Sequence, residues 1–246
     1  MLLSLEEAGN LGGNSRNKRN ELGTSVGGEP FLHERRVDLF HQLAPLLLRS
    51  PLLPTDALCV MWAMAKAQHL INMGIFDRLT ASLASEGMLE RSNTRLISQA
   101  PWSCGKMAGF EGRRFAARTG DGGGGNTSAT GPPPCAGPAD AYLRFLAANR
   151  ARMTPKHVSQ AIWAIGRMRP SDPVLITEMA DAASRLCLEL NVCEIASIAW
   201  GLGKPDFDGP EVVSGLIRRV VTSPDGLAER CTAQEATNML YSLRKL

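Results

Sequence analysis

The sequence predicts an all-α protein, an α-solenoid of about five two-helix repeats of roughly 37–41 residues each. Two observations lead to this fold class. Residues 158–167, VSQAIWAIGR, have four counterparts along the chain, each with an aromatic residue followed four positions later by Lys or Arg. The composition also favours helix over sheet, because Ala, Leu and Met are frequent while aromatic residues make up only 5% of the chain.

The spacing of the aromatic residues supports a true repeat. These anchors are separated by 40, 61, 37 and 41 residues, and all four Trp residues of the chain are anchors: Trp62, Trp102, Trp163, Trp200 and Tyr241. The long step contains a Gly- and Pro-rich tract, residues 118–138, and its removal leaves a step of 40. We therefore predict one flexible loop insertion in an otherwise regular array.

The chain begins with two segments before the first repeat. Residues 1–30 are rich in Gly, Asn and Ser and have no apolar period, which predicts a disordered N-terminal segment. Residues 31–49 carry apolar side chains at helical spacing and open the helical-repeat domain, residues 31–246. The first copy is expected as a helix over about 56–68, capped by Thr55 or Asp56, with a partner helix over 72–84.

The second copy, about 94–107, contains Pro101 directly before Trp102. A proline inside a helix removes one backbone hydrogen bond, so we predict a kink or a shortened helix there. Its partner is expected over 139–151. The third copy starts at Thr154-Pro155, ends at Met168 and is paired with 174–190. The fourth copy covers about 192–203 with a partner over 211–221, and the fifth covers 232–246, for which this sequence holds no partner helix.

A helical wheel divides each repeated helix into two edges. An aliphatic stripe, in the third copy Val158, Ala161, Ile162 and Ile165, is expected to pack on the partner helix. The Trp lies on the opposite edge. There it either packs between first helices of successive repeats, with a small residue three positions on, or stacks on a nucleobase.

Two repeated positions beside the aromatic anchor are candidate RNA-binding residues. The position four after it holds a cation in every copy, which either caps the helix C-terminus or binds phosphate: Lys66, Lys106, Arg167, Lys204 and Lys245. The position three before it holds Cys59 in the first copy and, in the others, polar side chains that are either solvated or able to read a base edge: Gln99, Gln160, Ser197 and Asn238.

The repeated core resembles the octotricopeptide repeat and the related heptatricopeptide repeat of apicomplexan organelle proteins. The best matches are residues 58–66, 158–167 and 195–204, and the resemblance covers about residues 31–246 apart from the insertion. It implies sequence-selective binding of organellar RNA, either rRNA or mRNA, in RNA maturation or stability or within a mitochondrial ribosome. Members often carry a RAP domain, and none is visible in this sequence.

Other classes of site find little support in the sequence. The six Cys residues form no C-x-x-C pair, the four His residues form no cluster, and no nucleophile–base motif stands out, so we predict no metal, no cofactor, no small-molecule substrate and no enzyme. No run of 18 apolar residues occurs, which argues against a membrane span. The formal charge of +3 permits an anionic partner without requiring one.

The resemblance thus implies an RNA-binding solenoid of a mitochondrion, or alternatively of a plastid, although the N-terminus matches an organellar presequence poorly. Ribosomal proteins are further expected partners. A scaffold for protein–protein interaction with the same fold is the alternative. The two differ in one structural expectation: RNA binding requires Lys66, Arg167 and Lys204 to share one exposed surface rather than to be scattered or held in ion pairs.

Overall fold

The computed structural model describes residues 42, 46, 49, 52–67, 73–108, 136–170, 172–204 and 207–245. All of them belong to one unit of the chain, Phe40–Leu246. This described part is all-α and contains no strand. The segment 1–30, nearly all of the helix expected over 31–49 and most of the tract 118–138 lie outside the described residues.

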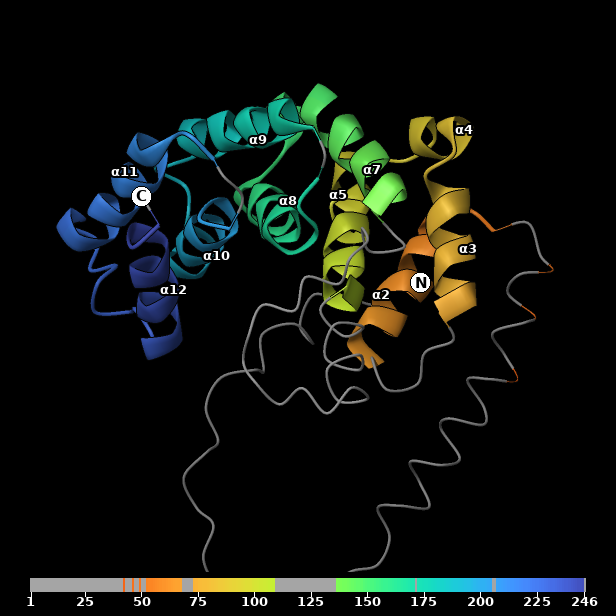
Figure 1. Cartoon of the computed structure of the whole chain (residues 1–246), viewed down its shortest axis with the longest axis horizontal. Helices are drawn as coiled ribbons and strands as arrows, with labels where there is room; N and C mark the ends of the chain where they lie inside the picture. Colours follow the sequence, from red (N-terminus) through yellow and green to blue (C-terminus); the bar gives the residue numbers. More distant parts are fainter. Residues whose placement is uncertain are drawn as a thin grey trace, which may run out of the picture. The chain divides into compact units, whose positions relative to one another are not determined.

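The helices fall into two sets that alternate along the chain (Figure 1). The first helix of each unit carries the repeated motif: α2 (Pro54–Ala67), α5 (Thr94–Ile97) with residues 99–108, α8 (Pro155–Met168), α10 (Val192–Leu202) and α12 (Ala233–Leu243). The second helices are α3 (Met73–Leu83), α7 (Ala136–Ala148), α9 (Pro173–Arg185) and α11 (Pro210–Thr222). First helices contact one another, as α10 does with α8 and α12, and second helices do likewise, as α9 does with α7 and α11.

Most predicted helices are present, and their limits differ for identifiable reasons. Helix α2 begins at Pro54, so the prediction of a cap at Thr55 or Asp56 was wrong. Proline suits the first helical position because its missing N–H would have no partner there. Helix α9 ends at Arg185, before the predicted residue 190. The short helices α4 (Glu86–Glu90) and η2 (Arg150–Arg152) were not predicted.

An arginine of α11 binds the segment that follows α9. The Arg219 guanidinium donates hydrogen bonds to the carbonyl oxygens of Leu188 and Leu190, at 2.7 and 2.6 Å. These carbonyls are therefore bound by a side chain of α11. Arg185 makes a similar bond of 3.3 Å from α9 to the carbonyl of Arg150. In both cases a second helix satisfies backbone groups at the end of the preceding one.

The interruption predicted near Pro101 is confirmed. Helix α5 ends at Ile97, residue 98 is in a turn, and the helix resumes over 99–108. In an unbroken helix the N–H of residue 101 would donate to the carbonyl of Ile97, and proline has no N–H. The break therefore falls one turn before the proline, and Trp102 and Lys106 remain on regular helix.

Side-chain caps fix where the later first helices begin. The Thr154 N–H donates to His157 Nδ1 at 3.3 Å before α8, in agreement with the predicted cap. Asn191 and Glu194 bond reciprocally to each other's backbone N–H groups before α10, and Thr232 and Glu235 do so before α12. Each such cap stabilises a helix by roughly 0.5–2 kcal/mol.

The aliphatic stripes form the core, as predicted. Val158, Ala161, Ile162 and Ile165 of α8 are fully buried, and so is the corresponding stripe of α10. Helix α8 contacts its second helix α9, and α10 contacts α11. Ile162 of the α8 stripe also lies against Gly201 of α10. Burying one Val, Leu or Ile side chain contributes roughly 1.5–3 kcal/mol, so these stripes dominate the stability of each helix pair.

The first helices α8 and α10 come into close contact at two glycines. A Cβ placed on Gly166 of α8 would lie 2.7 Å from the Cα of Gly201 in α10. A Cβ on Gly201 would collide with the carbonyl group of Ile162. Gly105 and Gly203, three residues after their anchors, also face the next first helix, with Trp163 and Ser242 as neighbours. The small residue predicted after the anchor therefore lies at the contact between helices.

This contact yields a stability prediction with an internal control. We expect Gly201→Ala to lower the free energy of unfolding by roughly 1–3 kcal/mol or more, because the neighbouring backbone must move. Gly215→Ala, in exposed helix α11 with open space around the new methyl group, should instead raise it by roughly 0.5–1 kcal/mol. Urea unfolding followed by circular dichroism measures both. A Gly201→Ala protein as stable as the Gly215→Ala protein would contradict the close contact.

Candidate nucleic-acid interface

The repeated aromatic and basic residues form one continuous row, which we call the aromatic–cation ladder. Its members are Trp62, Lys66, Trp102, Lys106, Trp163, Arg167, Trp200, Lys204 and Tyr241. Each residue comes from the last two turns of a first helix or directly follows it. The caps and close contacts described above align these ends, so one helical position in the sequence becomes one row in space.

The indole rings of successive units contact each other. The ring centroids of Trp102 and Trp163 are 6.3 Å apart with an interplanar angle of 35°, and those of Trp163 and Trp200 are 6.1 Å apart at 25°. Such offset pairs contribute about 0.5–1.5 kcal/mol beyond area burial. Trp163 thus has an aromatic neighbour on each side, which favours packing between repeats over base stacking for this residue.

Three of the ladder lysines lie between the rings of two units. Lys66 Nζ is 5.4 Å from the centroids of both Trp62 and Trp102. Lys106 Nζ is 5.5 Å from Trp102 and 5.2 Å from Trp163. Lys204 Nζ is 5.3 Å from Trp200 and 4.5 Å from Tyr241. Arg167 Cζ is 5.7 Å from Trp163. A cation–π contact contributes roughly 0.5–2 kcal/mol, so each of these lysines connects its own repeat to the next.

The ladder cations differ in exposure. Lys66 is exposed, and Lys106, Arg167 and Lys204 are half-buried. Within the described part of the chain, neither Lys66 nor Lys204 is paired with a carboxylate. Lys245 is exposed and follows α12 at the end of the row. The structure therefore brings together the basic residues that the sequence singled out.

The polar position before each anchor is partly used within the protein. Gln160 Oε1 accepts a hydrogen bond of 3.3 Å from Ser98 Oγ of the preceding unit. Asn238 Oδ1 accepts one of 3.1 Å from Gln234 Nε2. Gln99 and Ser197 are half-buried, and Cys59 is exposed. These side chains share one helical position, as predicted. Gln160 forms a hydrogen bond with the preceding unit, and Asn238 forms one within its own helix.

Charge is separated along the first helices. Their carboxylates in the described part lie in the first turn, at Asp56, Glu194 and Glu235, while the ladder cations lie at or just beyond the other end. Glu194 and Lys204 are ten residues apart, or about 15 Å along a helix, beyond the ~8 Å screening length at physiological salt. Each helix C-terminus carries about −0.5 charge, so five unit cations leave a net positive edge of about +2.5.

Tyr241 lies beside several cations of this edge. A hydrogen bond with the Lys204 side chain lowers the pKa of Tyr241, and the charges of Lys204, Lys245 and Arg169 lower it further against the effect of burial. Arg169 was not among the predicted residues. It ends α8 in the left-handed conformation, with φ of 51°, and its N–H donates to the Ile165 carbonyl at 2.8 Å. The Arg-Met-Arg-Pro sequence at 167–170 was its one available signal.

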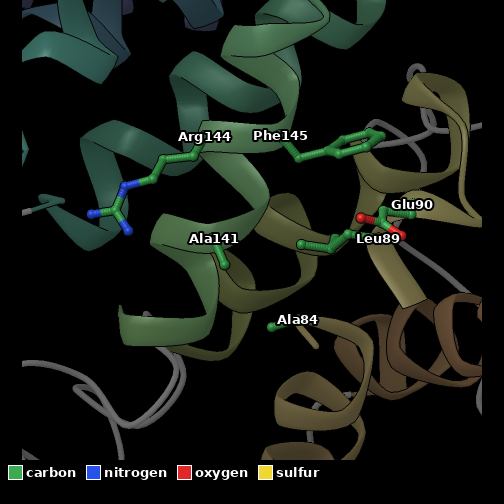
Figure 2. A pocket seen from close by; sticks show the side chains of 6 residues that line it. All are labelled: Ala84, Leu89, Glu90, Ala141, Arg144 and Phe145. Carbon is green, nitrogen blue, oxygen red and sulfur yellow. The ribbon is translucent and has the colours of Figure 1, made fainter. Parts of the chain in front are cut away.

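A hollow of about 420 Å³ lies away from the ladder, between α7 and the segment of α3 and α4. Its walls are Ala84, Leu89, Glu90, Ala141, Arg144 and Phe145. Figure 2 shows Arg144 and Glu90 pointing to opposite sides. Arg144 Nε instead lies 3.9 Å from the Asp172 carboxylate. The charged groups do not converge, so the hollow offers no arrangement for acid–base chemistry.

Two of the described thiols, Cys193 and Cys231, have raised pKa values. Burial raises the pKa of the Cys193 thiol, and the charge of Glu235 raises it further, which keeps the thiol protonated. Cys231 is shifted in the same direction for the same reasons. Among the described residues, no three His, Cys, Asp or Glu side chains are grouped to bind a metal ion.

No family model matches the chain, and no curated protein matches it. The resemblance to octotricopeptide-type repeats therefore stays a prediction. None of the helices that the structure describes has the length and apolarity needed to cross a bilayer.

The environment of Tyr241 gives a pH prediction. Its lowered folded-state pKa means that the tyrosinate form is favoured on folding. This contribution to stability is present at alkaline pH and is lost as the pH falls through the folded pKa, so Tyr241 adds none near neutrality. We expect Lys204→Met to raise the pKa of Tyr241, as measured by titrating the ¹³C tyrosine NMR signals. Lys156→Met, in the first turn of α8, is the control and should leave the value unchanged.

Proposed function

We propose that this chain is an α-solenoid of an RNA-binding, octotricopeptide-like type, and that the cations of the ladder bind phosphates of the RNA backbone. The observation that carries the proposal is the alignment of Lys66, Lys106, Arg167 and Lys204 beside one row of aromatic rings. A line of cations on one edge is the electrostatic footprint of a nucleic-acid partner.

The proposed contact uses cations more than aromatic faces. The Trp163 ring already lies between the Trp102 and Trp200 rings, which supports a packing role for it. The polar residues Gln99, Gln160, Ser197 and Asn238 and the terminal cation Lys245 complete the candidate surface. Assignment to an organelle, to RNA processing or stability, and to a mitochondrial ribosome rests on the family resemblance alone.

A protein scaffold is the alternative function, and a separate observation favours it. Val174, Leu188 and Val221 are 60%, 85% and 72% exposed on or beside the second helices. Such residues are candidate contacts for a protein. This function makes no use of the ladder, so variants of the ladder cations distinguish the two.

The direct test is to crosslink the native protein to RNA in cells and to sequence what is recovered. We expect specific RNA fragments well above the level of a non-binding control. Recovery at the control level would remove the support for RNA binding and leave the scaffold as the better function.

A quantitative test removes the proposed phosphate contacts. The triple variant Lys66→Gln, Arg167→Gln, Lys204→Gln should weaken binding to the recovered RNA and make the plot of log K against log salt shallower by about 2, at roughly 0.7 per phosphate contact. The control variant, Arg78→Gln, Arg152→Gln, Arg218→Gln, removes the same charge from exposed residues on α3, η2 and α11. Equal losses in both variants would indicate a general charge effect, against the ladder as the binding surface.

A further inference from the structure

Trp62 is the most exposed tryptophan of the ladder. Its side chain is 37% exposed, whereas Trp102, Trp163 and Trp200 are half-buried. The contacts between indole rings join Trp102 to Trp163 and Trp163 to Trp200, and within the described part of the chain none of them includes Trp62. Packing between repeats, which accounts for the Trp163 ring, therefore does not account for the ring of Trp62.

The surface beside Trp62 on α2 consists of small side chains. Cys59 and Ala63, which are three residues before the ring and one after it, are both exposed. In the third unit the first of these positions holds the longer Gln160, whose Oε1 accepts a hydrogen bond from Ser98 of the preceding unit. The small residues of α2 leave the Trp62 ring accessible to a flat ligand.

One face of the Trp62 ring is already occupied by a cation. Lys66 Nζ lies over it, 5.4 Å from its centroid, and is equally far from the Trp102 ring. Lys66 is therefore on the side of Trp62 that faces the next unit. Over the ranges that the structure describes, no other ring or cation lies against Trp62, so its second face is left for a ligand.

We propose that this second face of Trp62 stacks on an unpaired nucleobase of single-stranded RNA, and that Lys66 binds the phosphate of the same nucleotide. This inference rests on the proposed function and adds a base contact to it at one place in the ladder. An aromatic side chain beside an exposed cation is the combination that binds single strands, because every base has a π-face and every nucleotide a phosphate.

The contact selects unpaired nucleotides without selecting their sequence. A base inside a duplex is already stacked on both sides, so it must leave the stack before it can lie on Trp62. Stacking is tolerant of base identity, because it uses the face of the base and not its hydrogen-bonding edge. The ladder would thus hold phosphates along its length and a base at Trp62.

The test compares two single strands that carry the same phosphates. One is an RNA of about 12 uridines, and the other is its abasic counterpart, with ribose and phosphate but no bases. Fluorescence anisotropy of end-labelled strands at about 50 mM salt measures the affinity of the full chain for each. We expect Trp62→Leu to weaken binding of oligouridine by at least about five-fold and to leave binding of the abasic strand unchanged.

Three further variants make the comparison specific. Trp62→Phe keeps an aromatic face and should retain most of the affinity for oligouridine. Lys66→Gln removes a phosphate contact and should weaken binding of both strands. Leu53→Ala is the control: it truncates a side chain that is 54% exposed just before the opposite end of α2, and it should change neither affinity.

The possible failures are distinguishable. Equal affinity of the wild type and Trp62→Leu for oligouridine would overturn base stacking and leave phosphate binding intact. A wild type that binds neither strand would contradict the proposed function as well. Circular dichroism checks that each variant is folded.

A measurement on the wild type does not depend on any variant. A 5-bromouridine in the oligouridine strand crosslinks under ultraviolet light to an aromatic side chain on which it stacks, and mass spectrometry of the digested protein identifies that residue. We expect Trp62 as the main crosslinked residue. Crosslinks confined to other residues would overturn the proposal.

Discussion

The ladder depends on how closely successive first helices can approach. Gly166 and Gly201 bring the backbones of α8 and α10 into contact, and Gly105 and Gly203 play the same part at other junctions. At this separation an indole ring reaches the indole of the next unit, at 6.1–6.3 Å, and a lysine side chain reaches both. A Cβ at Gly166 or Gly201 would force the helices apart, and the rings with them. The glycines are therefore as much a part of the candidate interface as the cations.

The cations of the ladder combine two requirements that usually conflict. Cations at the ends of helices stabilise the fold by offsetting the negative charge of the helix C-termini. In the ladder they also occupy fixed positions beside aromatic rings. A partly neutralised charge attracts an anion less strongly. Here the acids of the first helices are a full helix length away, so much of the positive charge remains at the edge. The same residues can thus stabilise the helices and present a positive surface, because the helix C-termini offset only part of each cation's charge.

Much of this structure could be predicted from the periodicity of the sequence. The remainder depends on contacts between distant residues, which a periodic pattern does not reveal. The aliphatic stripes, the interruption before Pro101 and the cap at Thr154 were predicted because each depends on neighbours within one helix. The turn after α9 was missed, and in the structure it is bound by Arg219, more than thirty residues away from Leu188. The members of the ladder were predicted, but their contacts between units were not, because a helical wheel describes one helix and not its neighbour. Thus the position of Lys106 between Trp102 and Trp163 required the structure.

All four tryptophans of the chain belong to the ladder. The intrinsic fluorescence of the protein therefore originates almost wholly from one surface, with no indole elsewhere to dilute it. Neighbouring rings at about 6 Å exchange excitation energy readily, and an ammonium group beside an indole alters its emission. The emission of each tryptophan is thus sensitive to the arrangement of the whole row of rings. The repeat has given this chain a built-in optical probe at the place where its helical units join.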